Sequence, residues 1–221
     1  MNVWVLIPAY NEEENIGSLL SKIKDKGISV IVIDDGSTDN TYEVACREAN
    51  VVLKNEKNMG KGSSIRKGIL FLLDNIDFDY VITMDADSQH SPQDLDKFLK
   101  EANRGADFVI GDRMGSPSGM PFVRVATNRL MSFMISKIAK QRIPDTQCGF
   151  RLIKRTVLEN VNIATNKFEI ESEIIIKAAR RGFTIKSIPI ESIYFKGHPS
   201  NIHPFYDTLR FIRFITKLNN E

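Results

Sequence analysis

The chain has few cysteines, little net charge and no long apolar run. Cys46 and Cys148 are the only cysteines among 221 residues, too few for a disulfide framework or a cysteine zinc site, so we expect a reducing compartment. The 30 basic and 28 acidic residues leave a formal charge of +2, too small to argue for a nucleic-acid partner. No apolar stretch approaches the length that spans a bilayer, and the opening Val3–Ile7, followed by Pro8, is too short for a cleavable signal. We therefore expect a cytoplasmic chain that contacts a membrane, if at all, only at its cytoplasmic surface.

The size and composition suit a single α/β domain. With 42% apolar and 26% charged residues, the chain can bury a substantial core and has an ordinary globular composition. Val3–Ile7 and Ile28–Ile33 are apolar segments expected as buried strands, and each is followed by a helix with apolar residues at helical spacing. This early repeat of strand, loop and helix predicts a Rossmann-like α/β fold, with a mixed, mostly parallel central sheet flanked by helices.

An apolar run, Tyr80–Met84, ends in two carboxylates, Asp85 and Asp87, separated by Ala86. Ligands of open α/β sheets bind beyond the carboxyl ends of buried strands, and residues two apart on a strand point the same way. Both acids could therefore face one hard cation, which would complete its shell with water and substrate phosphates. Asp-x-Asp alone is also common in turns and solvated loops, so its context must decide.

Residues in three further segments of the chain could contact the base, the ribose or the diphosphate of a nucleotide. Another strand ends at Asp34 and Asp35, where a carboxylate can accept hydrogen bonds from a base imide or ribose hydroxyls; turn formation is the alternative explanation. Lys61 lies between two glycines at an expected helix start but lacks the upstream glycine of a Walker loop, which argues against that class while leaving a phosphate contact open. Arg113 follows a strand at residues 107–110, and its guanidinium could stabilise charge on a departing diphosphate.

Two basic segments also carry apolar residues. Residues 122–140 include Arg124 and Arg129 and form either an amphipathic helix packed on the domain or a basic, apolar lip for a lipid phosphate. Residues 204–221 predict a basic amphipathic helix, which lies on an anionic membrane surface or packs against the preceding domain, residues 1–203.

Four motifs follow one another along the chain: Pro8-Ala9-Tyr10-Asn11-Glu12-Glu13, Asp34-Asp35-Gly36-Ser37-Thr38-Asp39, Asn58-Met59-Gly60-Lys61-Gly62 and Asp85-Ala86-Asp87-Ser88-Gln89-His90. In this order they resemble the family 2 glycosyltransferases of GT-A fold. Within that family the chain is most similar to dolichol-phosphate mannose synthases and dolichyl-phosphate glucosyltransferases.

The resemblance implies a donor site and a metal site. Pro8, Tyr10, Glu12 and Asp35 would hold the nucleoside. The metal ligands would be Asp85, Asp87 and Gln89, with Mg²⁺ or Mn²⁺ between them and the diphosphate. The whole nucleotide-sugar site would comprise Pro8, Tyr10, Glu12, Asp35, Lys61, Asp85, Ala86, Asp87, Gln89 and Arg113. Asp87 and Arg113 are the expected catalytic residues.

The acceptor side departs from the mannose synthase pattern. Those enzymes often carry an Arg followed by Gly-x-Ser-Lys-Leu, whereas here Asn201 stands where the lysine is expected, and Lys196 precedes it. We expect Arg124, Arg129 and Lys196 to contact the acceptor phosphate.

Acceptor chemistry separates the alternatives. A hydroxyl acceptor usually needs a general base, for which Asp145, Glu169 or Glu171 would have to serve, whereas a lipid phosphate, with a second pKa of about 6, is already largely dianionic. We expect an inverting, metal-dependent transfer of a hexose from a UDP-glucose or GDP-mannose type of donor to polyprenyl or dolichyl phosphate. A saccharide or other hydroxyl acceptor, and a non-catalytic nucleotide-sugar-binding domain, remain alternatives. A membrane-protein partner or a homo-oligomer is left open.

Overall fold

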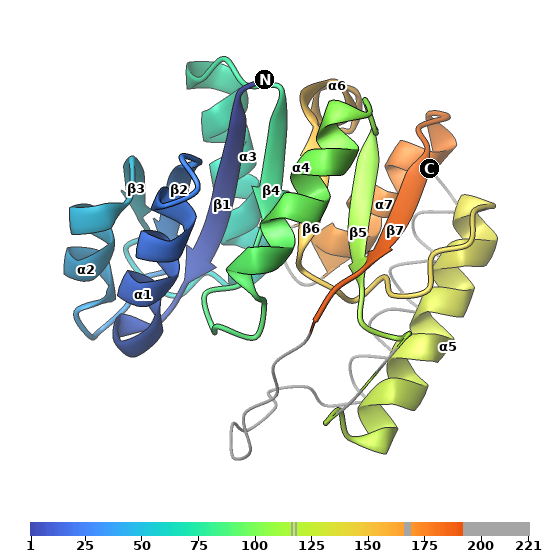
Figure 1. Ribbon diagram of the computed structural model, residues 1–221, viewed down its shortest axis with the longest axis horizontal. Coiled ribbons are helices and arrows are strands. Elements are labelled where there is room, and N and C mark those ends of the chain that lie inside the picture. Colours follow the sequence, from blue (N-terminus) through green and yellow to red (C-terminus); the bar gives the residue numbers. More distant parts are fainter. Residues whose placement is uncertain (116, 118, 166–168, 192–221) are drawn as a thin grey trace.

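The computed structural model describes residues 1–115, 117, 119–165 and 169–191, which form one sheet with helices on both faces (Figure 1). The strands are β1 (Val3–Ala9), β2 (Ser29–Asp34), β3 (Val51–Lys54), β4 (Tyr80–Thr83), β5 (Phe108–Asp112), β6 (Arg151–Lys154) and β7 (Ile185–Pro189). The helices are α1 (Glu13–Lys24), α2 (Thr41–Glu48), α3 (Lys61–Asn75), the short 3₁₀ helix η1 (Pro92–Asp94), α4 (Leu95–Asn103), α5 (Phe122–Ala139), α6 (Arg155–Asn160) and α7 (Glu169–Arg180).

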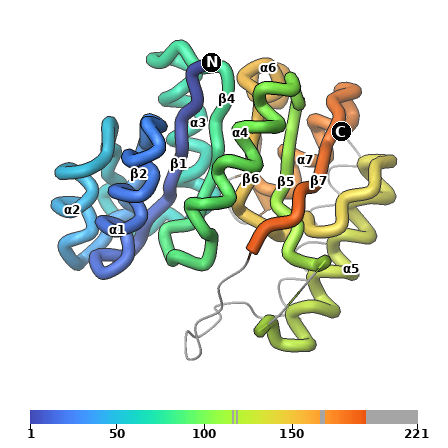
Figure 2. The backbone as a smooth tube through the Cα atoms, viewed as in Figure 1, coloured from blue at the N-terminus to red at the C-terminus, as the bar shows by residue number. Residues whose placement is uncertain are grey.

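The sheet order is β3-β2-β1-β4-β6-β5-β7. Every neighbouring pair is parallel except those of β6, which runs antiparallel to both β4 and β5. Figure 2 shows β6 between β4 and β5, although it follows both along the chain. The mixed, mostly parallel sheet expected from the sequence is thus confirmed, with one reversed strand at its centre.

The core fills both faces of the sheet. α1 and α4 cover the near face in Figure 1 and α3 and α7 the far face. The interiors of β1, β2, β4 and β5 are largely buried, and α1 presents Ile16, Leu19, Leu20 and Ile23 to the sheet, spaced three or four residues apart as a helical stripe requires. Among the described helices, none combines the length and the apolarity that a membrane crossing needs.

β1 continues through Pro8 to Ala9. The carbonyl of Leu6 accepts from the amide of Met84, next to β4, and Asp35 donates to Ala9 on the β2 side. Since alternate residues of a strand turn their backbone groups to the same neighbour, Pro8 faces β4, where it has no N–H to donate. The β1–β4 pairing ends at Leu6↔Thr83, and the two strands can separate where Asp85 and Asp87 follow.

Candidate active site at the carboxyl ends of β1, β2 and β4

Three parallel strands end at the same edge of the sheet. The register pairs Ala9 of β1 with Asp34 of β2, and Leu6 of β1 with Thr83 of β4. The motifs that follow these strands therefore gather along one edge, as expected from parallel strands. Tyr10 is 43% exposed there, while the Glu12 amide donates to Thr41 Oγ1 at 2.7 Å, tying the β1 loop to the start of α2.

Asp35 organises the loop that leads to α3. Its carboxylate accepts hydrogen bonds from Asn55 Nδ2 (2.7 Å) and from the backbone amides of Met59 (3.0 Å) and Gly60 (2.7 Å). The residue is only 3% exposed. Asp35 thereby fixes the position from which Lys61, the first residue of α3, extends.

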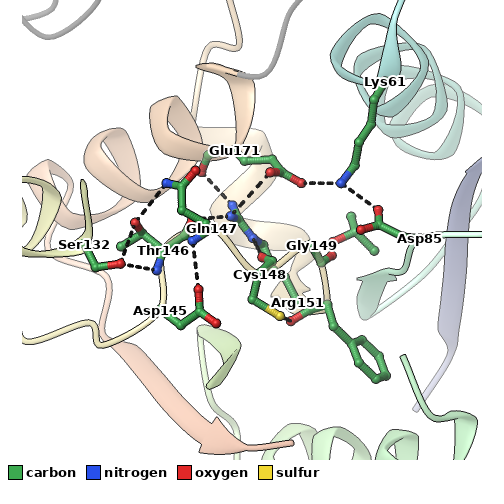
Figure 3. A network of polar contacts seen from close by, with 12 residues as sticks. Lys61, Asp85, Ser132, Asp145, Thr146, Gln147, Cys148, Gly149, Arg151 and Glu171 are labelled. Carbon is green, nitrogen blue, oxygen red and sulfur yellow. Dashed lines mark hydrogen bonds and ion pairs between the residues drawn. The ribbon is translucent and has the colours of Figure 1, made fainter. Parts of the chain in front are cut away.

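Lys61 bridges two carboxylates (Figure 3). Its Nζ lies 2.6 Å from Asp85 Oδ1 and 3.1 Å from Glu171 Oε1. Burial alone would lower the pKa of Lys61, but the neighbouring charges of Asp85 and Glu171 raise it overall. Burial likewise opposes ionisation of Asp85, and the Lys61 ammonium outweighs it, which brings the pKa of Asp85 to about 2. The bridge is therefore a true ion pair at neutral pH.

Arg151 extends this network beneath the site. It is 2% exposed. Its guanidinium donates to the carbonyls of Cys148 (2.7 Å), Thr146 (2.8 Å) and Glu171 (2.6 Å) and lies 3.8 Å from Glu171 Oε2. One buried cation thus joins the segment before β6 to the start of α7, and Glu171 lies between Arg151 and Lys61 (Figure 3).

Gly149 packs its backbone against the Lys61–Asp85 pair. A Cβ at this position would lie 2.8 Å from Asp85 Oδ2 and 2.9 Å from Lys61 Nζ. Thr83 Oγ1 donates to the Gly149 carbonyl at 2.7 Å, which holds the glycine in place. The close approach leaves no room for a side chain unless the ion pair moves.

Asp87 is in a different situation from Asp85. Burial and the nearby Asp85 carboxylate raise its pKa to about 6, and no ion pair within the described ranges includes it. It accepts a hydrogen bond from the Gln89 amide at 3.0 Å. A divalent cation would relieve the repulsion between the two acids, so the residues fit a hard cation. The described residues contain no cluster of three or more His, Cys, Asp or Glu side chains suited to a metal, and the shell would need Gln89, water or the diphosphate.

His90 and Cys148 lie behind the acids. Burial lowers the pKa of His90 to about 4 and raises that of Cys148 to about 12, so both are neutral at pH 7. His90 packs on Phe150 with ring centroids 5.2 Å apart. Neither side chain is set up as a nucleophile or a charged ligand, and both help to bury the back of the site.

Arg113 is held by a buried carboxylate. Its Nε lies 2.7 Å from Asp145 Oδ2 and its Nη2 3.0 Å from Oδ1, with Arg113 5% and Asp145 0% exposed. The positive charge of Arg113 also favours ionisation of Asp85, so it acts within electrostatic range of the acids. The pair fixes the guanidinium beside the site and occupies both Asp145 oxygens.

α5 carries two of the expected acceptor residues. Its inner side buries Asn128, Ser132, Ile135 and Ala139, while Phe122 is 85% and Phe133 61% exposed. Arg129 is exposed and Arg124 half-buried. The helix thus packs on the domain, as one interpretation expects, and its outer side carries basic and apolar residues. The lip for a lipid phosphate stays a prediction. Lys196 and residues 204–221 lie outside the described residues.

The structure brings together Lys61, Asp85 and Asp87 as expected, and adds Gly149 from the segment before β6, Arg151 from β6 and Glu171 from α7. The sequence pointed to Glu171 only as an alternative base. Gly149 and Arg151 gave no comparable signal, although the Gly-Phe-Arg run before β6 places a small and a charged residue next to an apolar strand.

Known proteins resemble this chain in sequence and in fold. The model of "Glycosyl transferase family 2" matches residues 4–161. Glycosyltransferase AglJ of Haloferax volcanii is 32% identical over 211 residues, covering 93% of this chain and 68% of that protein. The UDP-N-acetylglucosamine–dolichyl-phosphate N-acetylglucosaminyltransferase of Methanococcus voltae is 27% identical, covering 87% of this chain and 86% of that protein. Glucosyl-3-phosphoglycerate synthase of Mycobacterium tuberculosis, solved with Mn²⁺ and UDP, superimposes with a TM-score of 0.69 at 19% identity, covering 95% of this chain and 75% of that one. The chain therefore belongs to the family 2 glycosyltransferases and has their GT-A fold.

Proposed function

We propose that this glycosyltransferase moves a hexose, with inversion, from a nucleotide-diphosphate sugar to polyprenyl or dolichyl phosphate. The observation that carries the proposal is that Asp145 and Glu171, two of the three acids that could serve as the base for a hydroxyl acceptor, are paired with cations. Both oxygens of Asp145 face Arg113. Glu171 Oε1 lies 3.1 Å from Lys61 Nζ and Oε2 lies 3.8 Å from Arg151 Nη2, so each of these two acids already faces a cation. A phosphate acceptor needs no base, because it is already ionised at neutral pH.

The donor side rests on Asp85, Asp87 and Gln89. These residues would hold Mg²⁺ or Mn²⁺, which when bound acts as a Lewis acid on the leaving diphosphate. Lys61 and Arg113 supply fixed positive charge beside the position where that diphosphate would lie. Pro8, Tyr10, Glu12 and Asp35, from the ends of β1 and β2, would line the nucleoside pocket. The glucosyl-3-phosphoglycerate synthase of the same fold was solved with Mn²⁺ and UDP, which supports the use of a divalent cation together with a nucleotide diphosphate.

The acceptor side rests on α5 and its flanks. The chain has six basic residues and no acid between Asp112 and Asp145, and exposed apolar side chains such as Phe122 and Phe133 occur on the same helix. Such a surface favours an anionic membrane, where a polyprenyl phosphate would be presented. Arg124 and Arg129 would attract the phosphate, and Lys196 is a third candidate. The dolichyl phosphate in the name of the Methanococcus voltae relative supports this acceptor class.

A transfer assay tests the proposal. Radiolabelled UDP-glucose, UDP-N-acetylglucosamine and GDP-mannose would each be incubated with the protein, polyprenyl phosphate and Mg²⁺ or Mn²⁺, and label extracted into organic solvent would be counted. We expect label in the organic phase with one donor, and its loss when EDTA removes the cation. Transfer to soluble saccharides instead would favour a hydroxyl acceptor, and donor binding without any product would favour a non-catalytic domain.

A further inference from the structure

Lys61 places a fixed positive charge against one of the two acids expected to hold a cation. Its Nζ is 2.6 Å from Asp85 Oδ1, one of the two oxygens with which this carboxylate could bind a divalent cation. A second positive charge on the same carboxylate would face strong repulsion from the ammonium at this range. In the nucleotide-free protein, the ammonium and a divalent cation are therefore alternatives at Asp85.

Neighbouring residues hold both the backbone and the ammonium group of Lys61 in place. The start of α3 is fixed by the hydrogen bonds of Met59 and Gly60 to Asp35, at the edge where the nucleoside is expected. The tip is enclosed by the Gly149 backbone and by Glu171, which Arg151 holds from below. Lys61 thus connects the nucleoside side of the site to the cation side.

Glu171 gives the ammonium a second partner. It lies 3.1 Å from Lys61 Nζ and belongs to α7, whereas Asp85 follows β4 (Figure 3). When Lys61 moves away from Asp85, it keeps one carboxylate and gains the oxygens of a diphosphate. The movement therefore exchanges one anion for another and leaves no buried charge unpaired.

We propose that Lys61 makes cation binding depend on the nucleotide. Without nucleotide its ammonium competes with the divalent cation for Asp85, and a bound diphosphate draws the ammonium away and so admits the cation. This inference rests on the proposed nucleotide-diphosphate donor. It assigns to Lys61 a coupling role between two ligands, in addition to a contact with phosphate, and the coupling is reciprocal because the two binding equilibria are linked.

Mn²⁺ titrations followed by the electron paramagnetic resonance signal of free Mn²⁺ test the proposal without acceptor or turnover. Each protein is titrated alone, with UDP and with GDP. For Lys61→Gln we expect Mn²⁺ binding without nucleotide to tighten on the order of tenfold, and binding with nucleotide to become weaker than in the wild type. Lys61→Arg keeps the charge and should retain weak nucleotide-free binding. Lys24→Gln, which removes an exposed lysine paired with Glu48 at 3.2 Å, is the matched control and should match the wild type.

Glu171→Gln gives a response of opposite sign. With its second partner neutralised, the ammonium stays with Asp85, and nucleotide-free Mn²⁺ binding should weaken. A fold that was merely loosened would not shift Mn²⁺ affinity in opposite directions in the two variants, and melting curves would identify any variant that does not fold. Unchanged or weaker nucleotide-free binding in Lys61→Gln, or tightening in Glu171→Gln or Lys61→Arg, would overturn the proposal. If the wild-type protein binds neither UDP nor GDP, the proposed donor is overturned instead. Nucleotide binding is therefore measured separately from Mn²⁺ binding.

Discussion

Asp35, which follows β2, and the two acids that follow β4 occupy equivalent places at one edge of the sheet, yet they have different partners. Asp35 receives three hydrogen bonds from uncharged donors of its own chain. Asp85 is paired with an ammonium, and Asp87 has a pKa raised to about 6 by burial and by Asp85. One acid thus organises a loop through uncharged donors, whereas Asp85 pairs with a lysine ammonium beside a second carboxylate.

The comparison predicts the largest effect for Asp87→Asn. If Asp87 is a cation ligand, transfer to polyprenyl phosphate should fall by more than about a hundredfold, beyond the loss usual for residues that only support a ligand. The melting temperature should stay the same or rise, because the repulsion from Asp85 is removed. Asp74→Asn, at an exposed position of α3, is the control for transfer. Normal turnover in Asp87→Asn would refute the assignment of this acid.

Gly149→Ala should weaken binding on the β4 side with little cost to the fold. The new methyl group would meet only the ends of the Asp85 and Lys61 side chains, which can move, so we expect Mn²⁺–nucleotide affinity to fall on the order of tenfold. Gly111→Ala is the contrasting variant. Its methyl group would lie 2.6 Å from Ile190 Cδ1 and should instead lower the free energy of unfolding by about 1–3 kcal/mol through overpacking. Equal losses of stability in both variants would contradict the distinction.

Asp35→Asn should act mainly on stability. The asparagine keeps one acceptor oxygen, but its NH₂ group replaces the second. The wild-type carboxylate accepts from Asn55, Met59 and Gly60, so in the variant at least one of these buried donors loses its partner. We expect a loss of about 1–3 kcal/mol in the free energy of unfolding, measured by urea denaturation. Loss of nucleotide binding without loss of stability would show that Asp35 is primarily a nucleoside ligand, as the resemblance implies, and would remove the contrast between the two strand ends.

The sequence predicted the features that depend on residues close together along the chain. Apolar runs ending in acid predicted the strand ends of β2 and β4, and the parallel pattern predicted that they meet at one edge. The Arg151–Glu171–Lys61 network could not be predicted in this way, because it depends on β6 entering antiparallel between β4 and β5. The pattern of apolar and polar residues in β6 does not indicate that this strand lies between β4 and β5. The extension of β1 through Pro8 to Ala9 was not predicted, for a related reason. Only the strand pairing shows that Pro8, which has no N–H to donate, faces β4 beyond the last paired residue, Leu6.

Glu173 provides a further acid for this comparison, with the smallest expected effect. Burial alone would raise its pKa, but hydrogen bonds from Lys177, Thr165 and Ala164 lower it overall, so it combines backbone amide donors like those of Asp35 with an ammonium partner like that of Asp85. Because its folded-state pKa lies below its ordinary value of 4.5, its contribution to stability is complete above that pH and is lost as the pH falls toward the folded-state value. We expect Glu173→Gln to cost on the order of 1 kcal/mol at pH 7, measured by urea denaturation, and to flatten the decline in stability of the wild type below pH 4.5. A variant whose stability fell as steeply with acid as the wild type would assign the acid sensitivity to other carboxylates, and Glu173 would then not share the structural role of Asp35.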